Sequence, residues 1–248
     1  MNLKRVLLIS VVFNIMLLAM VLALGYKFNI VQLAVNKIFP NDNYAYNVLE
    51  LNYYQEMSAR YNMHPNNEGE IIFLGDSLTE YSYFEEIFID ELVINRGIGS
   101  DTTEGVYYRL PEVVESNPEK IFLMVGINDI GNGMATDEII NNYQEILEYI
   151  QTESPKTKVY IQSVLPCNTD LMEDNLRNNN RTFENIYNLN EQLKMLGESM
   201  NCEYIELDSS FRESSSTQMQ MKYTVDGVHL SEEGYALWAD VISQYVYE

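Results

Sequence analysis

The stretch IIFLGDSLTEYS, residues 71–82, joins a short apolar run to a cluster of turn-forming residues. The run at 71–74 is continuous and rich in isoleucine, which is typical of a buried strand. Gly, Asp and Ser then mark the end of that strand, and Asp or Ser often caps a following helix. Taken alone, this pattern indicates a turn more often than a reactive serine. Whether Ser77 has a chemical role therefore depends on the rest of the chain.

The same alternation of apolar runs and helical segments continues along the sequence. Helical spacing begins at about 44 and favours a single folded domain over 44–248. Strands that alternate with helices predict right-handed crossovers and a parallel sheet covered on both faces. The expected strands are 71–74, 92–94, 121–125, 159–163 and 204–207, and the expected later helices are 102–115, 137–152, 182–200 and 232–245. The stretch 83–91 fits neither pattern clearly.

The N-terminal residues predict a membrane segment. Lys4 and Arg5 precede an uncharged apolar run over 6–24, which at ~1.5 Å per residue nearly covers the ~30 Å hydrocarbon core. The apolar region of a cleaved signal peptide is usually only about 7–15 residues long, and no A-x-A cleavage site follows this run. We therefore expect a cytoplasmic tip and transmembrane signal anchor in 1–25 and a juxtamembrane connector in 26–43. The domain would lie outside the cell membrane, and secretion after cleavage is the alternative.

Composition narrows the classes of partner. The 15 Lys and Arg residues against 37 Asp and Glu residues give a net charge of −22. Such a surface repels phosphate backbones, so nucleic acid is not an expected partner. Cys167 and Cys202 fit no zinc spacing and would lie at opposite edges of the sheet, which predicts two unpaired thiols. We expect neither a metal nor a cofactor.

Polar clusters follow the expected strands. GDS contains Ser77, NRGIGSDTT spans 95–103, GINDIGNG contains Asn128, and VDGVHLSEEGY near the C-terminus contains Asp226 and His229. The carboxyl ends of parallel strands meet at one edge of the sheet, and α/β proteins bind their ligands there. These clusters therefore predict a site at that edge.

The residue types in the clusters suit acyl transfer. A serine hydroxyl needs a neighbouring base, and His229 is the better candidate, since His64 precedes the first strand and reads as a solvated loop residue. Asp226 could orient the imidazole, although a turn or cap carboxylate is the alternative. The Asn128 amide and backbone N–H groups near Ser77 and in the GIGS turn could bind an oxyanion, although Asn128 also suits a turn.

Together, these four stretches resemble the SGNH, or GDSL-type, esterase and lipase family. The resemblance implies a flavodoxin-like three-layer α/β/α sandwich with a five-stranded parallel sheet. It implies that Ser77 is the nucleophile and that His229 and Asp226 complete a catalytic triad. Asn128 and the backbone N–H groups of Ser77 and Ser100 would form the oxyanion hole, with the supporting residues Asp76 and Gly99.

One position departs from the family pattern. We call the four stretches the first to fourth blocks in chain order, so the second block is NRGIGSDTT. In the family this block often reads GIGGDT, and this chain has Ser100 at the position of the last of those glycines. Serine keeps the backbone N–H but adds a side chain beside the acyl pocket. The backbone conformation at Ser100 is therefore a question for the structure.

The expected function is that of a membrane-anchored, extracytoplasmic serine esterase. Its substrate would be a short acyl ester, most simply an acetyl ester, of a carbohydrate such as an acetylated glycan or of a small molecule. An O-acyltransferase that uses the same residues is one alternative. A catalytically silent glycan-binding module is another, although glycan binding requires no such triad.

Overall fold

The computed structural model describes residues 47–63, 67, 69–172, 180–213 and 215–248. The expected membrane anchor and connector, and His64, lie outside the described residues. In the described ranges, no helix combines the length and apolar character needed to cross a membrane.

A five-stranded parallel sheet forms the centre of the domain, in the order β2-β1-β3-β4-β5. This is the flavodoxin-like strand order, in which the chain changes direction between β1 and β3 and leaves a crevice at their carboxyl ends. Each predicted strand overlaps an observed one. The strands are β1 (Ile71–Gly75), β2 (Val93–Gly97), β3 (Lys120–Met124), β4 (Lys158–Gln162) and β5 (Glu203–Ile205).

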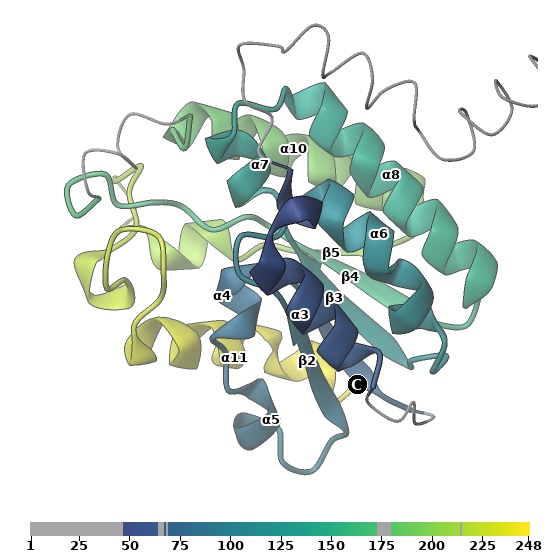
Figure 1. Cartoon of the computed structure of the whole chain (residues 1–248). Helices are drawn as coiled ribbons and strands as arrows, with labels where there is room; N and C mark the ends of the chain where they lie inside the picture. The colour runs from purple at the N-terminus through teal and green to yellow at the C-terminus, as the bar shows by residue number, and fades with distance from the viewer. Residues whose placement is uncertain (1–46, 64–66, 68, 173–179, 214) are drawn as a thin grey trace, which may run out of the picture. The chain divides into compact units, whose positions relative to one another are not determined.

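Helices cover both faces of this sheet, as predicted (Figure 1). One face packs against α6 (Thr103–Val114), α8 (Thr136–Glu153) and α10 (Phe183–Ser199). The other packs against α4 (Ser77–Glu80), α5 (Phe84–Ile87) and α11 (Glu232–Val246). The short elements are η1 (Val48–Glu50), α7 (Ile127–Gly131), η2 (Asp208–Phe211) and η3 (Met221–Tyr223). The stretch 83–91, which the sequence left open, contains α5.

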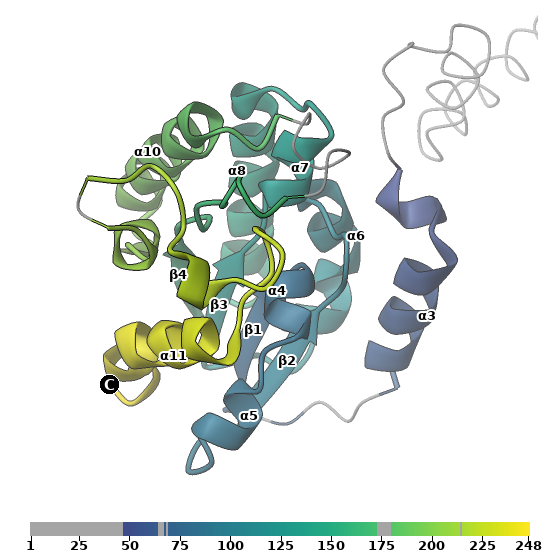
Figure 2. The ribbon, with the colours of Figure 1, turned by 90° about the vertical axis from the view of Figure 1, so that its left-hand side faces the viewer.

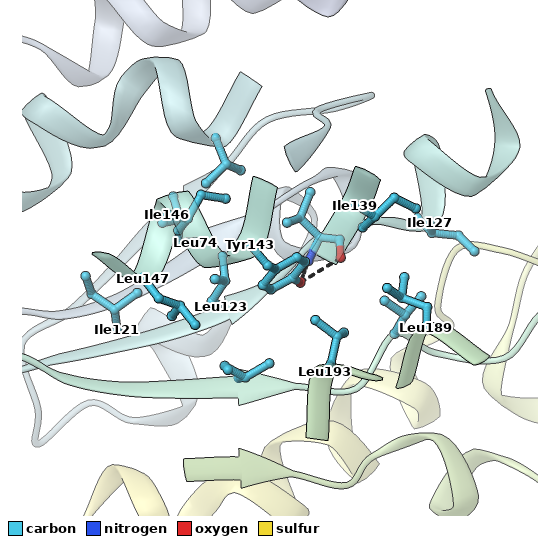
Figure 3. Close-up of a cluster of buried hydrophobic side chains, with 14 of the residues drawn as sticks. Leu74, Ile121, Leu123, Ile127, Ile139, Tyr143, Ile146, Leu147, Leu189 and Leu193 are labelled. Carbon is cyan, nitrogen blue, oxygen red and sulfur yellow. Dashed lines mark hydrogen bonds between the residues drawn. The ribbon is translucent and has the colours of Figure 1, made fainter. Parts of the chain in front are cut away.

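Alternate strand residues supply the two cores. In β3, Leu123 faces the cluster under α6, α8 and α10, whereas Phe122 faces α11, because successive side chains of a strand point to opposite faces. Within the first cluster, the Tyr143 hydroxyl donates to the Val125 carbonyl at 2.7 Å, and the Val125 N–H donates to that hydroxyl at 3.1 Å (Figure 3). This pair satisfies the backbone just beyond β3 and fixes the start of the loop that carries Asn128.

An additional helix, α3 (Asn52–Tyr61), packs on the loop that follows β2 (Figure 2). Tyr54 donates its hydroxyl proton to the Gly105 carbonyl, and Tyr61 donates to the Gly97 carbonyl, both at 2.6 Å. Ile98 is fully buried beneath this helix. The helical spacing at the start of the domain thus forms η1 and α3, which cover one of the loops expected at the site.

The last helix, α11, closes the opposite face of the sheet. Trp238 is fully buried and its indole N–H donates to Gln162 Oε1 at 2.7 Å. The Tyr235 hydroxyl donates to the Leu78 carbonyl at 2.9 Å, which ties α11 to α4. Cys167 and Cys202 form no disulfide, so the prediction of two unpaired thiols is confirmed.

Candidate active site

Ser77 lies where the sequence predicts, between β1 and a helix. It is the first residue of α4, and Asp76 caps that helix by accepting the Leu78 N–H at 2.9 Å. The first N–H groups of a helix have no acceptor inside it, so the backbone N–H of Ser77 is available to a ligand. The Ser77 Oγ lies 3.0 Å from His229 Nε2.

The loop before α11 lies beside α4 (Figure 2). It brings His229 within hydrogen-bond distance of Ser77. His229 Nδ1 lies 2.7 Å from Asp226 Oδ2, while Asp226 Oδ1 accepts the backbone N–H groups of His229 at 2.7 Å and Val228 at 2.9 Å. One carboxylate oxygen therefore holds the turn and the other holds the ring. The sequence left open whether Asp226 orients the imidazole or serves as a turn carboxylate. In the structure it does both, with one oxygen for each contact.

The electrostatics of Asp226 suit an ionised orienting group. Partial burial alone would raise the pKa of this carboxyl. The hydrogen bonds from the His229 ring and from the two backbone N–H groups outweigh burial and lower the pKa below its usual value. Asp226 is thus a carboxylate at neutral pH, and it favours the Nδ1–H tautomer that leaves Nε2 free to accept the proton of Ser77.

Asn128 lies on α7, after a turn at Gly126 whose φ of 124° favours glycine. Its amide nitrogen donates to the Asp101 carbonyl at 3.0 Å, and its amide oxygen accepts from the Arg181 guanidinium at 2.9 Å. These contacts fix which end of the amide is the donor. Within the described part of the chain, its second amide hydrogen has no hydrogen-bond partner.

The second block contributes backbone rather than side chains. Gly99 donates its N–H to Glu80 Oε2 at 2.6 Å, so this N–H is already engaged. Ser100 is exposed and adopts φ 67°, the left-handed conformation that glycine favours. Ser100 therefore holds a backbone conformation that is less costly for glycine than for serine, and its N–H is the remaining candidate donor in the GIGS turn.

A buried network of carboxylates lies beneath these loops. The Asp101 carboxylate accepts from Arg109 Nε at 2.9 Å, and Arg109 also donates to the Gly75 carbonyl just before Ser77. Asp129 accepts from the N–H of Thr103 at 3.0 Å and from its hydroxyl at 2.6 Å. Burial raises the pKa of Asp101 and of Asp129 to about 6. The network joins the loop after β2, the start of α6 and the helix α7 to the end of β1.

Asp76 should make stability depend on pH. Burial raises its pKa to about 7, against opposition from the Leu78 N–H. The folded state then holds this proton more tightly than the unfolded chain, so the contribution of Asp76 to the free energy of unfolding falls as the pH rises from about 4 to about 7. Asp76→Asn keeps a cap of equal quality and should flatten that part of the melting-temperature profile, measured by circular dichroism. Asp240→Asn, at an exposed position, is the control and should keep the wild-type profile. A profile of Asp76→Asn that is parallel to that of wild type would contradict this assignment.

Three contacts at the site were not predicted from the sequence. Arg181 reaches Asn128 from 53 positions away, and Glu80 lies one turn after Ser77 but contacts Gly99, 19 positions away; neither contact has a local sequence signal. Tyr81 packs against the His229 ring, with centroids 5.5 Å apart and planes inclined by 48°. Residues four apart lie on one face of a helix, so the spacing of Tyr81 from Ser77 could have revealed this contact.

Comparison with known proteins identifies the family of the chain. The sequence profile of the GDSL-like lipase/acylhydrolase family matches residues 73–237. The chain belongs to this family. The match includes Ser77, Ser100, Asn128, Asp226 and His229, so all the candidate residues of the site fall within it.

The GDSL-like relatives include both sequences and solved structures. Platelet-activating factor acetylhydrolase IB subunit alpha2 of Rattus norvegicus is 28% identical over 178 residues, which cover 69% of this chain and 73% of the relative. A solved structure from Streptococcus pneumonia, described as a platelet activating factor, has a TM-score of 0.73 and 28% identity, and the match covers 79% of this chain and 93% of that one. A GDSL-like lipase from Bacteroides thetaiotaomicron has a TM-score of 0.69 at 22% identity, covers 78% and 97%, and shows the same fold.

Proposed function

We propose that this protein is a serine esterase that hydrolyses short acyl esters, most simply acetyl esters, with Ser77 as the nucleophile. The observation that carries the proposal is the hydrogen-bonded series from Ser77 Oγ to His229 Nε2 and from His229 Nδ1 to Asp226, at 3.0 and 2.7 Å. Ser77 follows the carboxyl end of β1 in a flavodoxin-like sheet, and such folds bind ligands beyond the carboxyl ends of their strands. Membership of an acylhydrolase family supports cleavage of an ester bond.

In the first half of the reaction, Ser77 Oγ attacks the ester carbonyl carbon while His229 Nε2 takes the hydroxyl proton. Asp226 stabilises the imidazolium that forms and holds the ring in line with Ser77. Collapse of the tetrahedral intermediate breaks the bond to the leaving alkoxide, which receives the proton from His229. The products of this half are a free alcohol and an acyl group on Ser77.

In the second half, a water molecule replaces the alcohol. His229 takes a proton from that water, the hydroxide attacks the acyl carbon, and the bond to Ser77 Oγ breaks. Ser77 recovers its proton from His229, and the carboxylic acid leaves. Over the full cycle one ester and one water are consumed, one alcohol and one carboxylic acid are released, and the three side chains return to their starting states.

Both tetrahedral intermediates place a negative charge on the former carbonyl oxygen. Its donors are the N–H groups of Ser77 and Ser100 and the second amide hydrogen of Asn128. Since Arg181 and the Asp101 carbonyl already hold the Asn128 amide, this donor is oriented before substrate binds. Such preorganisation is the main source of oxyanion stabilisation.

The acetyl group is proposed as the acyl part for two reasons. The rat relative is named as an acetylhydrolase, and Ser100 adds a side chain to the GIGS turn where the family often has glycine, which favours a small acyl group. The net charge of −22 disfavours strongly anionic substrates. A neutral acetylated glycan or small ester is therefore the proposed substrate class.

A hydrolysis panel tests the function. Purified full-length chain in detergent would be assayed against chromogenic esters of increasing acyl length and against acetylated glycans, with release of acid measured directly. We expect turnover to be highest on acetyl esters and to depend on Ser77. Transfer of the acyl group to an added alcohol in preference to water would favour an acyltransferase instead.

Two substitutions separate the oxyanion donors. Ser100→Gly keeps the backbone N–H and removes a side chain from a left-handed residue, so acetyl-ester turnover should change by less than about tenfold, or ~1.4 kcal/mol. Asn128→Ala removes a donor and should lower turnover by about 10²–10³. Both variants would be measured on one chromogenic acetate. An equal loss in the two would mean that the Ser100 hydroxyl has a role of its own.

We also propose that residues 1–25 anchor the enzyme to the cell membrane with the domain outside. Full-length protein should then sediment with membranes after salt washing, and protease added to intact cells should remove the domain. Protein sequencing of the mature N-terminus gives an independent readout. A start near Gly25 would show instead that the segment is a cleaved signal peptide.

A further inference from the structure

Glu80 joins three segments of the domain at the edge of the site. It is the last residue of α4, one turn beyond Ser77. One carboxylate oxygen accepts the Gly99 N–H at 2.6 Å, and the other accepts the hydroxyl of Tyr53 on α3. Both oxygens of one carboxylate are thus occupied, one by the loop of the second block and one by a helix outside it.

Gly99 directly precedes Ser100, whose backbone conformation is unfavourable for a residue other than glycine. Ser100 holds φ 67° without being glycine, and such a conformation persists only where surrounding contacts determine it. The Gly99 N–H lies in the peptide before Gly99, and the Ser100 N–H lies in the peptide after it. By fixing the first peptide, Glu80 restricts the rotation that sets the direction of the second.

The backbone of Glu80 also packs directly on this loop. A side chain added at Gly97 would clash with the Glu80 backbone, so the close approach requires glycine there. Asn95 donates its side-chain amide to the carbonyl of Thr79 at 2.8 Å. The end of α4 and the end of β2 therefore behave as one unit, and Glu80 extends that unit to Gly99.

The support behind Glu80 comes from residues before the family match, which begins at 73. Tyr53 donates to Glu80, and this hydrogen bond is the main cause of the raised pKa of Tyr53. Tyr61 and Tyr54 on the same helix donate to the carbonyls of Gly97 and Gly105, on either side of Gly99. Three tyrosines of α3 thus hold the end of β2, the start of α6 and, through Glu80, the loop between them.

We propose that Glu80 is a positioning residue for the oxyanion hole: it fixes the Gly99 peptide so that the Ser100 N–H faces the reacting carbonyl, and Tyr53 holds Glu80 in place. This role rests on the proposed esterase function. The carboxylate does not touch the substrate, and its effect is carried through the backbone of Gly99 and Ser100.

The test compares four variants with wild type in detergent-solubilised full-length chain. Glu80→Ala removes both contacts, Glu80→Gln keeps an acceptor for Gly99 and a polar partner for Tyr53, and Tyr53→Phe removes only the supporting hydroxyl. Glu86→Ala, an exposed residue of α5, is the matched control. A fluorophosphonate that reacts with the active serine counts the competent sites, so kcat is expressed per competent site and misfolded protein does not contribute.

We expect Glu80→Ala to lower kcat on a chromogenic acetate by roughly tenfold to a hundredfold, with KM within about threefold of wild type. The rate of phosphonylation should fall by a similar factor, because the phosphonyl oxygen also needs the oxyanion donors. Glu80→Gln should return kcat to within about threefold of wild type, and Tyr53→Phe should lower it by about threefold or more. The pH profile of kcat should keep its shape in every variant, because the hydrogen bonds of His229 are untouched.

The outcomes separate the two proposals. Wild type that neither turns over esters nor reacts at Ser77 overturns the esterase function and, with it, the role of Glu80. Ser77-dependent turnover in wild type together with unchanged kcat per competent site in Glu80→Ala overturns only the role of Glu80. If Glu80→Ala does not fold, unchanged kcat in Tyr53→Phe or a Glu80→Gln variant that loses more than tenfold overturns it equally.

Discussion

Replacing Ser77 by alanine is expected to lower ester turnover by at least about 10⁴-fold, because the proposed acyl intermediate forms on the Ser77 hydroxyl. His229 and Asp226 would remain hydrogen-bonded to each other, and the oxyanion donors would keep their places. The variant should therefore still bind substrate, with the loss falling on kcat. The small residual rate would come from oxyanion stabilisation of direct attack by water.

The measurement is acid release from a chromogenic acetate over hours. The enzyme concentration is set high enough for a slow residual rate to be distinguished from the uncatalysed rate. Ser209→Ala is the matched control, since Ser209 is exposed on η2 and should leave turnover unchanged. Thermal unfolding would establish that both variants fold. Turnover in Ser77→Ala within tenfold of wild type would exclude Ser77 as the nucleophile.

Replacing His229 by alanine should have a comparable effect, because Ser77 then has no base within reach and residues that act as a unit fail together. Asp226→Ala should lose less, about 10³–10⁴-fold, since orienting the ring contributes less than accepting the proton. The double replacement of Ser77 and His229 should be no slower than either single one.

The other histidine supplies the control for this experiment. His64→Ala should keep wild-type turnover, since His64 precedes the first expected strand in the sequence and is not one of the candidate site residues. Rates for all the variants would be compared on the same chromogenic acetate at one pH. Turnover in His229→Ala within tenfold of wild type would assign the base to another group.

The layers of the fold were predictable because each depends on local composition. Continuous apolar runs identified the strands, such as the one at 121–125, and helical periodicity identified α6, α8, α10 and α11. The helices α4, α5 and α7 were not identified, because segments of four or five residues are too short to show a period of 3.6. Ser77 and Asn128 were nevertheless placed at the correct edge by the turn residues that follow β1 and β3.

The candidate residues were predictable in part for the same reason. Ser77, Asp226 and His229 lie in recognisable clusters, and the rule for parallel sheets places those clusters together. Glu80, Arg181 and Tyr53 act through contacts with residues 19 to 53 positions away. Such contacts arise only from the packing of whole elements, so no local pattern reports them.

The attachment of α11 across the sheet has a consequence for how the protein is made. Ser77 and its partner His229 are 152 residues apart, and the aromatic face with Phe122 and Tyr160 stays uncovered until α11 brings in Trp238. A chain still being synthesised therefore contains the serine without its base, and it exposes apolar surface that promotes aggregation. Contacts of such wide sequence separation also slow folding. The contact between Ser77 and His229 thus forms only after the loop before α11 has been synthesised, and a chain that still lacks α11 is a state that needs a chaperone.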